Sequence, residues 1–243
     1  MLTNCNPYLS MGTVFSDGMD SVNSSIISGS ITDISSLSDI VEKYVEEWLK
    51  KTTGSSPSPS YIQLFGTLIP TTINDYQNMK ITPNLNATQT QLSMINSVIS
   101  GVKFNTLDSL DSFFDGVDEQ IAICNSNNTS KQSIYIASAI ARASSSYWQK
   151  YLDTNSSGTT GWNAYLNTIN WIANYYSFPM WVNSSFLGSL SGFSQFQAAF
   201  VGQASYLNTM GIAGGQAGAL ISALGLAGGK IIFSLPLGPA KIY

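Results

Sequence analysis

The most regular alternation of apolar and polar residues runs from 131 to 153. Its apolar and small residues recur at steps of three and four, which places them on one face of a helix. These positions are Ile134, Ala137, Ala141, Ser144, Trp148 and Tyr151. The small residues in the middle of this face leave room for a neighbouring helix to approach closely. The pattern therefore predicts a helix over 131–152 that other helices pack against.

The same periodicity predicts further helices over 36–51, 87–102, 106–123 and 162–176. Serines and Gly29 weaken the spacing between 17 and 34, so we expect a long, loosely structured N-terminal part. A Ser/Pro-rich stretch at 52–60 indicates a linker, and the apolar run 62–69 is either a short strand or an extended segment. The chain is predicted to be mostly α: a helical bundle over 1–185, followed by a Gly/Ala-rich segment over 186–243.

The C-terminal segment is almost free of charge, and from Met210 to Gly229 it carries none over 20 residues. Three interpretations compete: a membrane span over 210–229, a glycine-rich helix buried in the core or against another copy, and an extended arm. We favour the buried helix, because glycine contributes little hydrophobicity to a membrane span. The run that follows, IIFSLPL, is uncharged and β-prone, which suits docking on a neighbouring subunit. The candidate assembly residues are Gly211, Gly215, Gly218, Gly225, Gly229, Ile231, Ile232 and Phe233.

Charged residues make up only 10% of the chain, against about 25% in an ordinary soluble domain. Ser, Thr, Asn and Gln replace them, and this composition is more typical of secreted, surface or assembly-forming proteins than of cytosolic enzymes. The net charge is −4 and there is no basic run, so nucleic acid is not an expected partner. Weak repulsion between copies favours self-association.

The chain contains no histidine, which excludes Ser-His-Asp catalysis and His-ligated metal sites. Cys5 and Cys124 either form one disulfide, if the compartment is oxidising, or remain thiols, with Cys124 a small buried residue. The opening at Met1 lacks the basic and apolar regions of a signal peptide. Given the composition, we expect that such a peptide has been removed from an exported protein.

Four carboxylates in 106–123 are spaced three, four and three, and therefore share one helix face: Asp108, Asp111, Asp115 and Asp118. They form either a cation or docking site or, as we prefer, a solvated face opposite the apolar one. Straight helical spacing converges poorly on one ion, and the Gly-containing loop of a calcium site is absent. No metal or cofactor is predicted.

Aromatic residues crowd the region from 148 to 181. The side chains of Trp162, Trp171, Tyr175 and Trp181 either stack on a sugar or fill the core between helices, which is the interpretation we prefer. Catalysis is not expected. Ser-Lys chemistry needs a lysine desolvated beside a serine, and Lys131 and Lys150 lie next to polar positions.

Two segments resemble an uncharacterised family of secreted proteins from the Bacteroidetes. The opening Asn6-Pro7-Tyr8, followed by Gly12 and Gly18-Met19-Asp20, is similar to its N-P-Y…G…G-L-D opening. The segment 136–148, IASAIARASSSYW, looks like its central S-I-A-R-x-S-x-x-Y-W helix, and members share a Gly/Ala-rich tail. The opening departs from the family at Phe15-Ser16-Asp17. The resemblance implies export and a mostly helical fold, and implies no catalytic residue.

The sequence therefore predicts a non-catalytic secreted or cell-surface protein that works by assembly, with itself or an envelope protein as partner. The alternatives are a carbohydrate-binding surface protein, which would use the aromatic cluster at 148–181, and a membrane-active protein with a glycine-zipper tail.

Overall fold

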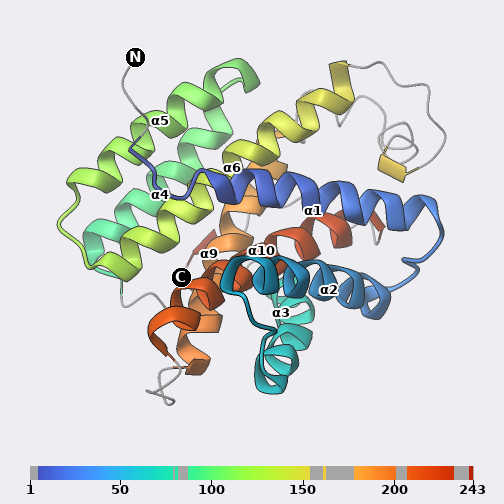
Figure 1. Ribbon diagram of the computed structural model, residues 1–243. Coiled ribbons are helices and arrows are strands. Elements are labelled where there is room, and N and C mark those ends of the chain that lie inside the picture. Colours follow the sequence, from blue (N-terminus) through green and yellow to red (C-terminus); the bar gives the residue numbers. More distant parts are fainter. Residues whose placement is uncertain are drawn as a thin grey trace.

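The computed structural model describes residues 5–78, 80–81, 87–153, 161–162, 178–200, 207–232 and 241–242. Within these ranges, eight helices pack as a bundle (Figure 1), which confirms the predicted mostly α fold. They are α1 (Ser10–Ile27), α2 (Ile34–Thr53), α3 (Pro59–Gln77), α4 (Gln89–Phe104), α5 (Leu107–Ile123), α6 (Asn128–Asp153), α9 (Phe178–Phe200) and α10 (Leu207–Ile232). Two strands of two residues, β1 (Lys80–Ile81) and β2 (Lys241–Ile242), pair in parallel, with Lys80 opposite Lys241.

Helix α10 lies at the centre of the bundle. Every residue from Ala217 to Lys230 is buried, as expected for a helix that is almost uniformly apolar or small around its circumference. Helix α9 packs along it, and α1, α2 and α3 cover its other sides (Figure 1). Helices α4 and α5 form an outer layer against α9 and α6 respectively. The Gly/Ala-rich segment thus supplies the core of the protein.

Glycines allow α9 and α10 to cross closely. A Cβ on Gly192 would lie 2.2 Å from the carbonyl oxygen of Gly218, and one on Gly218 would lie 2.6 Å from that of Gly192. Real Cβ atoms do not come so near a backbone oxygen, so only glycine fits at this crossing.

Helix α6 is buried on two faces. The predicted face packs on α9, where the Ser144 and Ser185 hydroxyl oxygens lie 3.0 Å apart, and its members from Ile134 to Trp148 are buried. A second face receives α1, because Gly12 lets that helix approach the Ala139 carbonyl and the Ala143 methyl group. The prediction that other helices pack closely on this one is confirmed.

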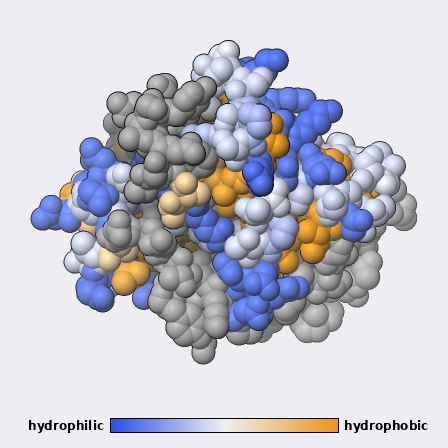
Figure 2. Space-filling view, turned by 90° about the horizontal axis from the view of Figure 1, so that it is seen from below, coloured by the Kyte–Doolittle hydropathy of each residue, from blue (hydrophilic) through white to orange (hydrophobic). Residues whose placement is uncertain are grey.

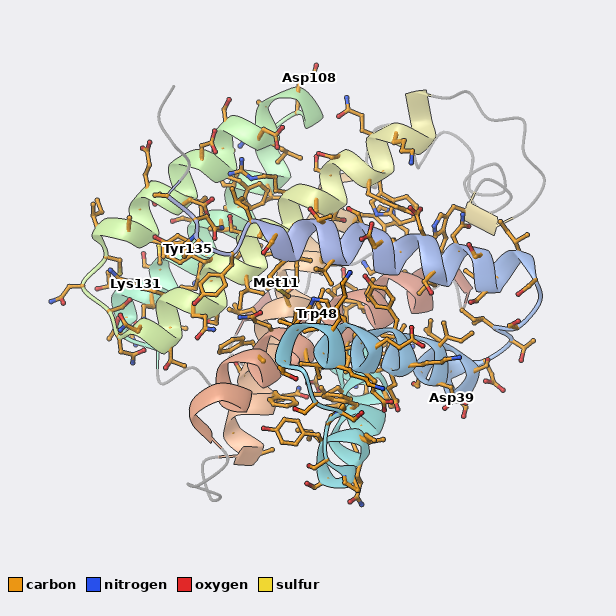
Figure 3. The ribbon with its side chains drawn as sticks, viewed as in Figure 1. Met11, Asp39, Trp48, Asp108, Lys131 and Tyr135 are labelled. Atoms are coloured by element: carbon orange, nitrogen blue, oxygen red, sulfur yellow. The ribbon has the colours of Figure 1, made fainter. Side chains whose placement is uncertain are left out.

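The predicted loose N-terminal part is wrong for most of its length, because Ser10–Ile27 forms helix α1. Met11, Phe15, Met19 and Val22 follow helical spacing and are all buried. Met11 lies between α1 and the helices beneath it (Figure 3). The serines that weakened the pattern lie mainly on the other side of the helix, where they cost little.

The prediction of a strand or extended segment at 62–69 is also wrong, since this run lies within α3. Gly54 ends α2 in the left-handed conformation, with φ +75°, as a glycine at that position should. Helix α3 starts soon after, at Pro59, where proline's missing N–H costs nothing. The linker at 52–60 is therefore a short turn between two helices.

The predicted helix at 162–176 lies outside the described residues apart from its first position. The predicted boundary at 185/186 falls inside helix α9.

Candidate functional site

The most unusual site is a buried lysine at the end of α10. Lys230 is 0% exposed, and its Nζ donates hydrogen bonds to Tyr76 Oη (2.8 Å), on α3, and to Ser184 Oγ, on α9. The same Nζ lies 4.1 Å from the centroid of the Tyr76 ring and 5.5 Å from that of the Trp181 ring. We call these four residues the Lys230 cluster. It joins three helices through one amine.

Burial controls the protonation of this cluster. Loss of hydration disfavours the ammonium ion and lowers the pKa of Lys230 to about 7. Burial also raises the pKa of the Tyr76 phenol, which the hydrogen bond from Ser184 opposes. Near neutral pH the amine is therefore divided between its charged and neutral forms, beside a phenol that stays neutral.

A neutral amine beside a serine hydroxyl is the arrangement that Ser-Lys catalysis uses. Here, however, Ser184 is only 2% exposed and Lys230 is fully buried, so a substrate has no route to either atom in this conformation. Ser184 also lies inside α9, where the backbone N–H groups are used in the hydrogen bonds of the helix. Its own Oγ lies 2.6 Å from the carbonyl oxygen of Met180. The cluster can bind and release a proton and can hold helices together.

The sequence contained a signal for this site that we missed. Lys230 follows 20 uncharged residues, so a helix through that stretch had to carry it into the core or to its edge. The two lysines considered for Ser-Lys chemistry lie elsewhere. Lys131 Nζ donates to the carbonyl oxygen of Ala122 (3.0 Å), and Lys150 is exposed.

A second buried polar cluster centres on Asp118, which is 0% exposed. Its carboxylate accepts hydrogen bonds from Ser138 Oγ (2.7 Å), Asn6 Nδ2 (3.1 Å) and Arg142 (3.3 Å). Arg142 also pairs with Asp115 (2.8 Å). Burial raises the pKa of Asp118 more than these partners lower it. We call these five residues the Asp118 cluster, and it fastens the N-terminal segment and α5 to α6.

The predicted solvated acidic face is therefore correct for Asp108 and Asp111, which are exposed, and wrong for Asp118. Asp108 lies at the outer end of α5 and points away from the bundle (Figure 3). The spacing could not distinguish the buried carboxylate from the exposed ones, because Asp118 is covered by α6 and by Asn6, which are distant in sequence. In the described part of the chain, no group of three or more Cys, Asp or Glu side chains is placed to hold a metal ion.

Residues of the two segments that resemble the secreted family contact each other. Tyr147 Oη, in the second segment, donates to Asp20 Oδ1, in the first (2.8 Å), and accepts from Trp162 Nε1 (2.9 Å). The backbone N–H of Trp162 in turn donates to Asn23 Oδ1 (2.9 Å). These bonds join α1 to the end of α6.

The candidate sugar-stacking residues fall into two groups. Trp162 and Trp181 are buried against Trp148, with ring centroids 5.5 and 4.7 Å from it, so neither offers a ring face to solvent. Trp171 and Tyr175 lie outside the described residues.

Several candidate assembly glycines make contacts within the chain. A Cβ on Gly215 would meet Phe193, and one on Gly225 would meet Ile69. A Cβ on Gly218 would meet Gly192 and Phe196. Gly229 is buried. The surroundings of Gly211, Ile231 and Ile232 lie outside the described part, as does Phe233 itself.

The possible disulfide is not formed in this structure. Cys5, which is exposed, and Cys124, which is half-buried, are both free thiols.

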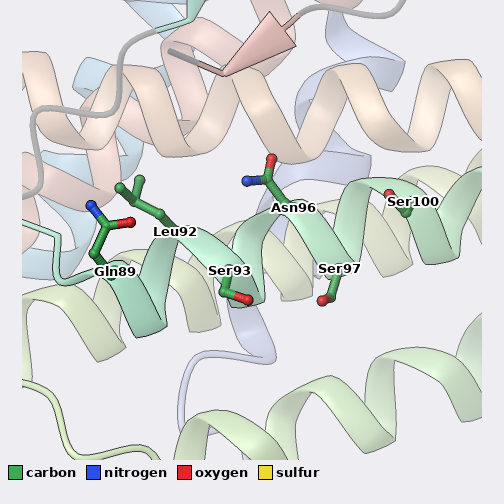
Figure 4. A pocket seen from close by; sticks show the side chains of 6 residues that line it. All are labelled: Gln89, Leu92, Ser93, Asn96, Ser97 and Ser100. Carbon is green, nitrogen blue, oxygen red and sulfur yellow. The ribbon is translucent and has the colours of Figure 1, made fainter.

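A hollow of about 450 Å³ lies along the outer side of α4 (Figure 4). Its described lining comes from that helix alone and is uncharged: Gln89, Leu92, Ser93, Asn96, Ser97 and Ser100. On the face of the molecule in Figure 2, apolar residues form small patches scattered among hydrophilic ones. The described lining of the hollow thus consists mainly of neutral amide and hydroxyl groups.

Within the described residues, no helix combines the length and the apolar character needed to cross a membrane. No known protein family, curated protein or solved structure matches the chain.

Proposed function

We propose that this is a non-catalytic secreted or cell-surface protein that acts by assembling with other copies of itself. Support comes from its low charge and from the neutral hollow along α4. The proposal also agrees with the burial of Ser184 and Lys230, the pair of residues best suited to catalysis.

The surface along α4 supports this proposal most directly. Four polar residues are exposed in consecutive turns of α4: Ser93, Asn96, Ser97 and Ser100. The opposite side of the helix is buried through Ile95, Val98 and Val102. Hydroxyl and amide groups can donate and accept hydrogen bonds across an interface without the large desolvation penalty of charged groups. With a net charge of only −4, two copies repel each other weakly.

The buried position of α10 decides which variants can test self-assembly. Ending the chain before α10 would remove the centre of the core, so loss of assembly could not be told from loss of folding. Substitutions on the surface avoid this problem. Ser93→Glu with Ser97→Glu places two like charges in the α4 hollow, and Ser55→Glu with Ser56→Glu adds the same charge in the exposed turn after α2.

Light scattering after size-exclusion chromatography, over a range of protein concentrations, then distinguishes the outcomes. We expect a wild-type mass above that of one chain, loss of that mass in the α4 variant, and its retention in the control variant. A wild-type protein that stays monomeric up to about 100 µM would refute self-assembly. Retention of assembly in both variants would refute the role of α4.

The cellular location is tested separately, in the cells that make the protein. Protease added to intact cells should degrade a surface protein, and a secreted one should be found in the medium. Recovery from the cytosol alone would contradict export.

A further inference from the structure

Helix α3 carries two residues on its exposed side that weaken a helix, Gly66 and Pro70. Proline has no N–H with which to bond the carbonyl oxygen four residues earlier, which here is that of Gly66. Glycine inside a helix is also less favourable than alanine. Both residues are exposed, and a Cβ on Gly66 would meet only Glu42 Oε1, at the ordinary contact distance of 3.8 Å. Packing within the described chain therefore explains neither residue.

Together these residues leave a hydrogen-bond acceptor open on the surface of α3. The carbonyl oxygen of Gly66 lacks the helical donor that position 70 would normally supply, and position 66 has no side chain to cover it. Glu42 Oε1, on α2, is a second acceptor beside the same gap. Ile62, one turn before Gly66, is 38% exposed and offers an apolar contact. We call Ile62, Gly66 and Pro70 the α3 notch, and it suits a partner that donates hydrogen bonds.

The charges of the outer helices limit which surfaces of two copies can meet. Exposed acids include Asp17 on α1, Asp39 and Glu47 on α2, and Asp108 and Asp111 on α5. Among the helices that expose three or more described residues, only α3 and α4 expose no charged one. In a chain of net charge −4, contact between these two faces keeps the acids of neighbouring copies apart.

The two uncharged faces also lie on different parts of the molecule. Helix α4 belongs to the outer layer beside α5, whereas α3 lies beside α2 and below α10 in the view of Figure 1. One copy can therefore use both faces at once, each with a different neighbour.

We propose that the exposed side of α4 in one copy binds the α3 notch of the next, so that Ser93, Asn96 and Ser97 donate hydrogen bonds to the open acceptors. This contact rests on the proposed self-assembly, and it identifies the surface to which α4 binds. Because the two surfaces differ, the contact is head-to-tail and builds chains or rings rather than closed dimers.

Two variants close the notch without touching α4. Gly66→Gln fills the gap with a side chain for which there is room, and Pro70→Ala restores a donor for the Gly66 carbonyl. Each replaces a residue that weakens the helix, so the urea midpoint of unfolding should rise. The concentration of half-assembly, from light scattering after size-exclusion chromatography, should nevertheless increase at least about tenfold.

Gly116→Gln, on α5, is the matched control. Nothing lies within 4 Å of the position that a Cβ on Gly116 would occupy, so this variant should also raise the urea midpoint. Its assembly should equal that of the wild type.

A mixture of two defective variants tests the head-to-tail arrangement. The variant with Ser93→Glu and Ser97→Glu keeps its notch, and Gly66→Gln keeps its α4 surface. At a concentration where the wild type is assembled, each alone should be monomeric, and their equimolar mixture should form a complex with the mass of two chains and stop there. Pairing of α4 with α4 predicts the opposite, since Gly66→Gln would then assemble alone and the mixture would gain nothing.

The outcomes separate this contact from self-assembly itself. Wild-type assembly that persists in Gly66→Gln and Pro70→Ala would overturn the α3 contact and leave the proposed function standing. A monomeric wild-type protein would overturn both. Since the two variants change different residues, misfolding of one leaves the other to decide.

Discussion

Replacing Gly192 by alanine tests the close crossing of α9 and α10. The new methyl group would lie 2.2 Å from the Gly218 carbonyl oxygen and 2.3 Å from Ser222 Oγ. Neither neighbour can move away easily. The first is helix backbone, and the second is buried and accepts a hydrogen bond from Thr72 (3.0 Å). The helices must therefore separate by about 1 Å to restore an ordinary contact.

That separation sets the magnitude of the effect. A gap of 0.5–1 Å removes about a quarter to a half of the dispersion energy of the atoms that face it. Those atoms include the rings of Phe193 and Phe196, which pack on Gly215 and Gly214 of α10. Overpacking usually costs about 1–3 kcal/mol and sometimes more, while alanine's higher helix propensity returns about 1 kcal/mol. Because the obstacle is backbone, we expect an overpacking cost at or above the top of that range, about 3–4 kcal/mol, and therefore a net loss of about 2–3 kcal/mol.

Gly116→Ala is the matched control. Gly116 lies inside α5, and nothing approaches within 4 Å of the position its Cβ would occupy, so only helix propensity changes. Urea unfolding of both variants should show Gly192→Ala destabilised by about 2–3 kcal/mol and Gly116→Ala stabilised by up to about 1 kcal/mol. Two variants of equal stability would refute the argument that backbone contact at the crossing requires glycine.

Two further predictions concern carboxylates. Burial, with repulsion from nearby acids, raises the pKa of Glu42 from 4.5 to about 7, so this residue destabilises the fold progressively as pH rises through that window. After allowance for its partial exposure, Glu42→Gln should stabilise the protein by roughly 1 kcal/mol at pH 8 and leave it unchanged at pH 4, in urea unfolding at both pH values. An equal gain from the exposed control Glu47→Gln would contradict this. Asp118→Ala should cost about 3 kcal/mol, because it leaves buried donors without their acceptor, whereas Asp111→Ala should cost less than about 0.5 kcal/mol. Equal costs would show that Asp118 is no more important than the exposed acid.

The sequence predicted those features that depend on local spacing. The face of α6 from Ile134 to Trp148 is buried as expected, because steps of three and four place its residues together whatever packs against them. Helix α1 was not predicted because the local sequence alone disfavours it. Its serines lower helix propensity, but the buried Phe15 and Met19 supply packing energy that outweighs this loss. Tertiary packing therefore determines that this segment is a helix.

The polar clusters depend on contacts distant in sequence and could not be predicted from spacing. Asp118 is 112 residues from Asn6, and Lys230 is 154 residues from Tyr76. In each case an ordinary polar position on one helix becomes buried when another segment covers it. For Lys230 a partial signal existed, since it interrupts a long uncharged helix. Identification of its partners required the position of α3 relative to α10.

The central position of α10 also changes where self-assembly should occur. An uncharged, glycine-rich helix first suggested a surface that another copy could cover. In the folded protein Gly215, Gly218 and Gly225 are already covered by α9 and α3, and replacing those contacts by contacts with another copy would open the core. We therefore propose that self-assembly uses the outer helices, among which the neutral side of α4 is the described surface that best suits it.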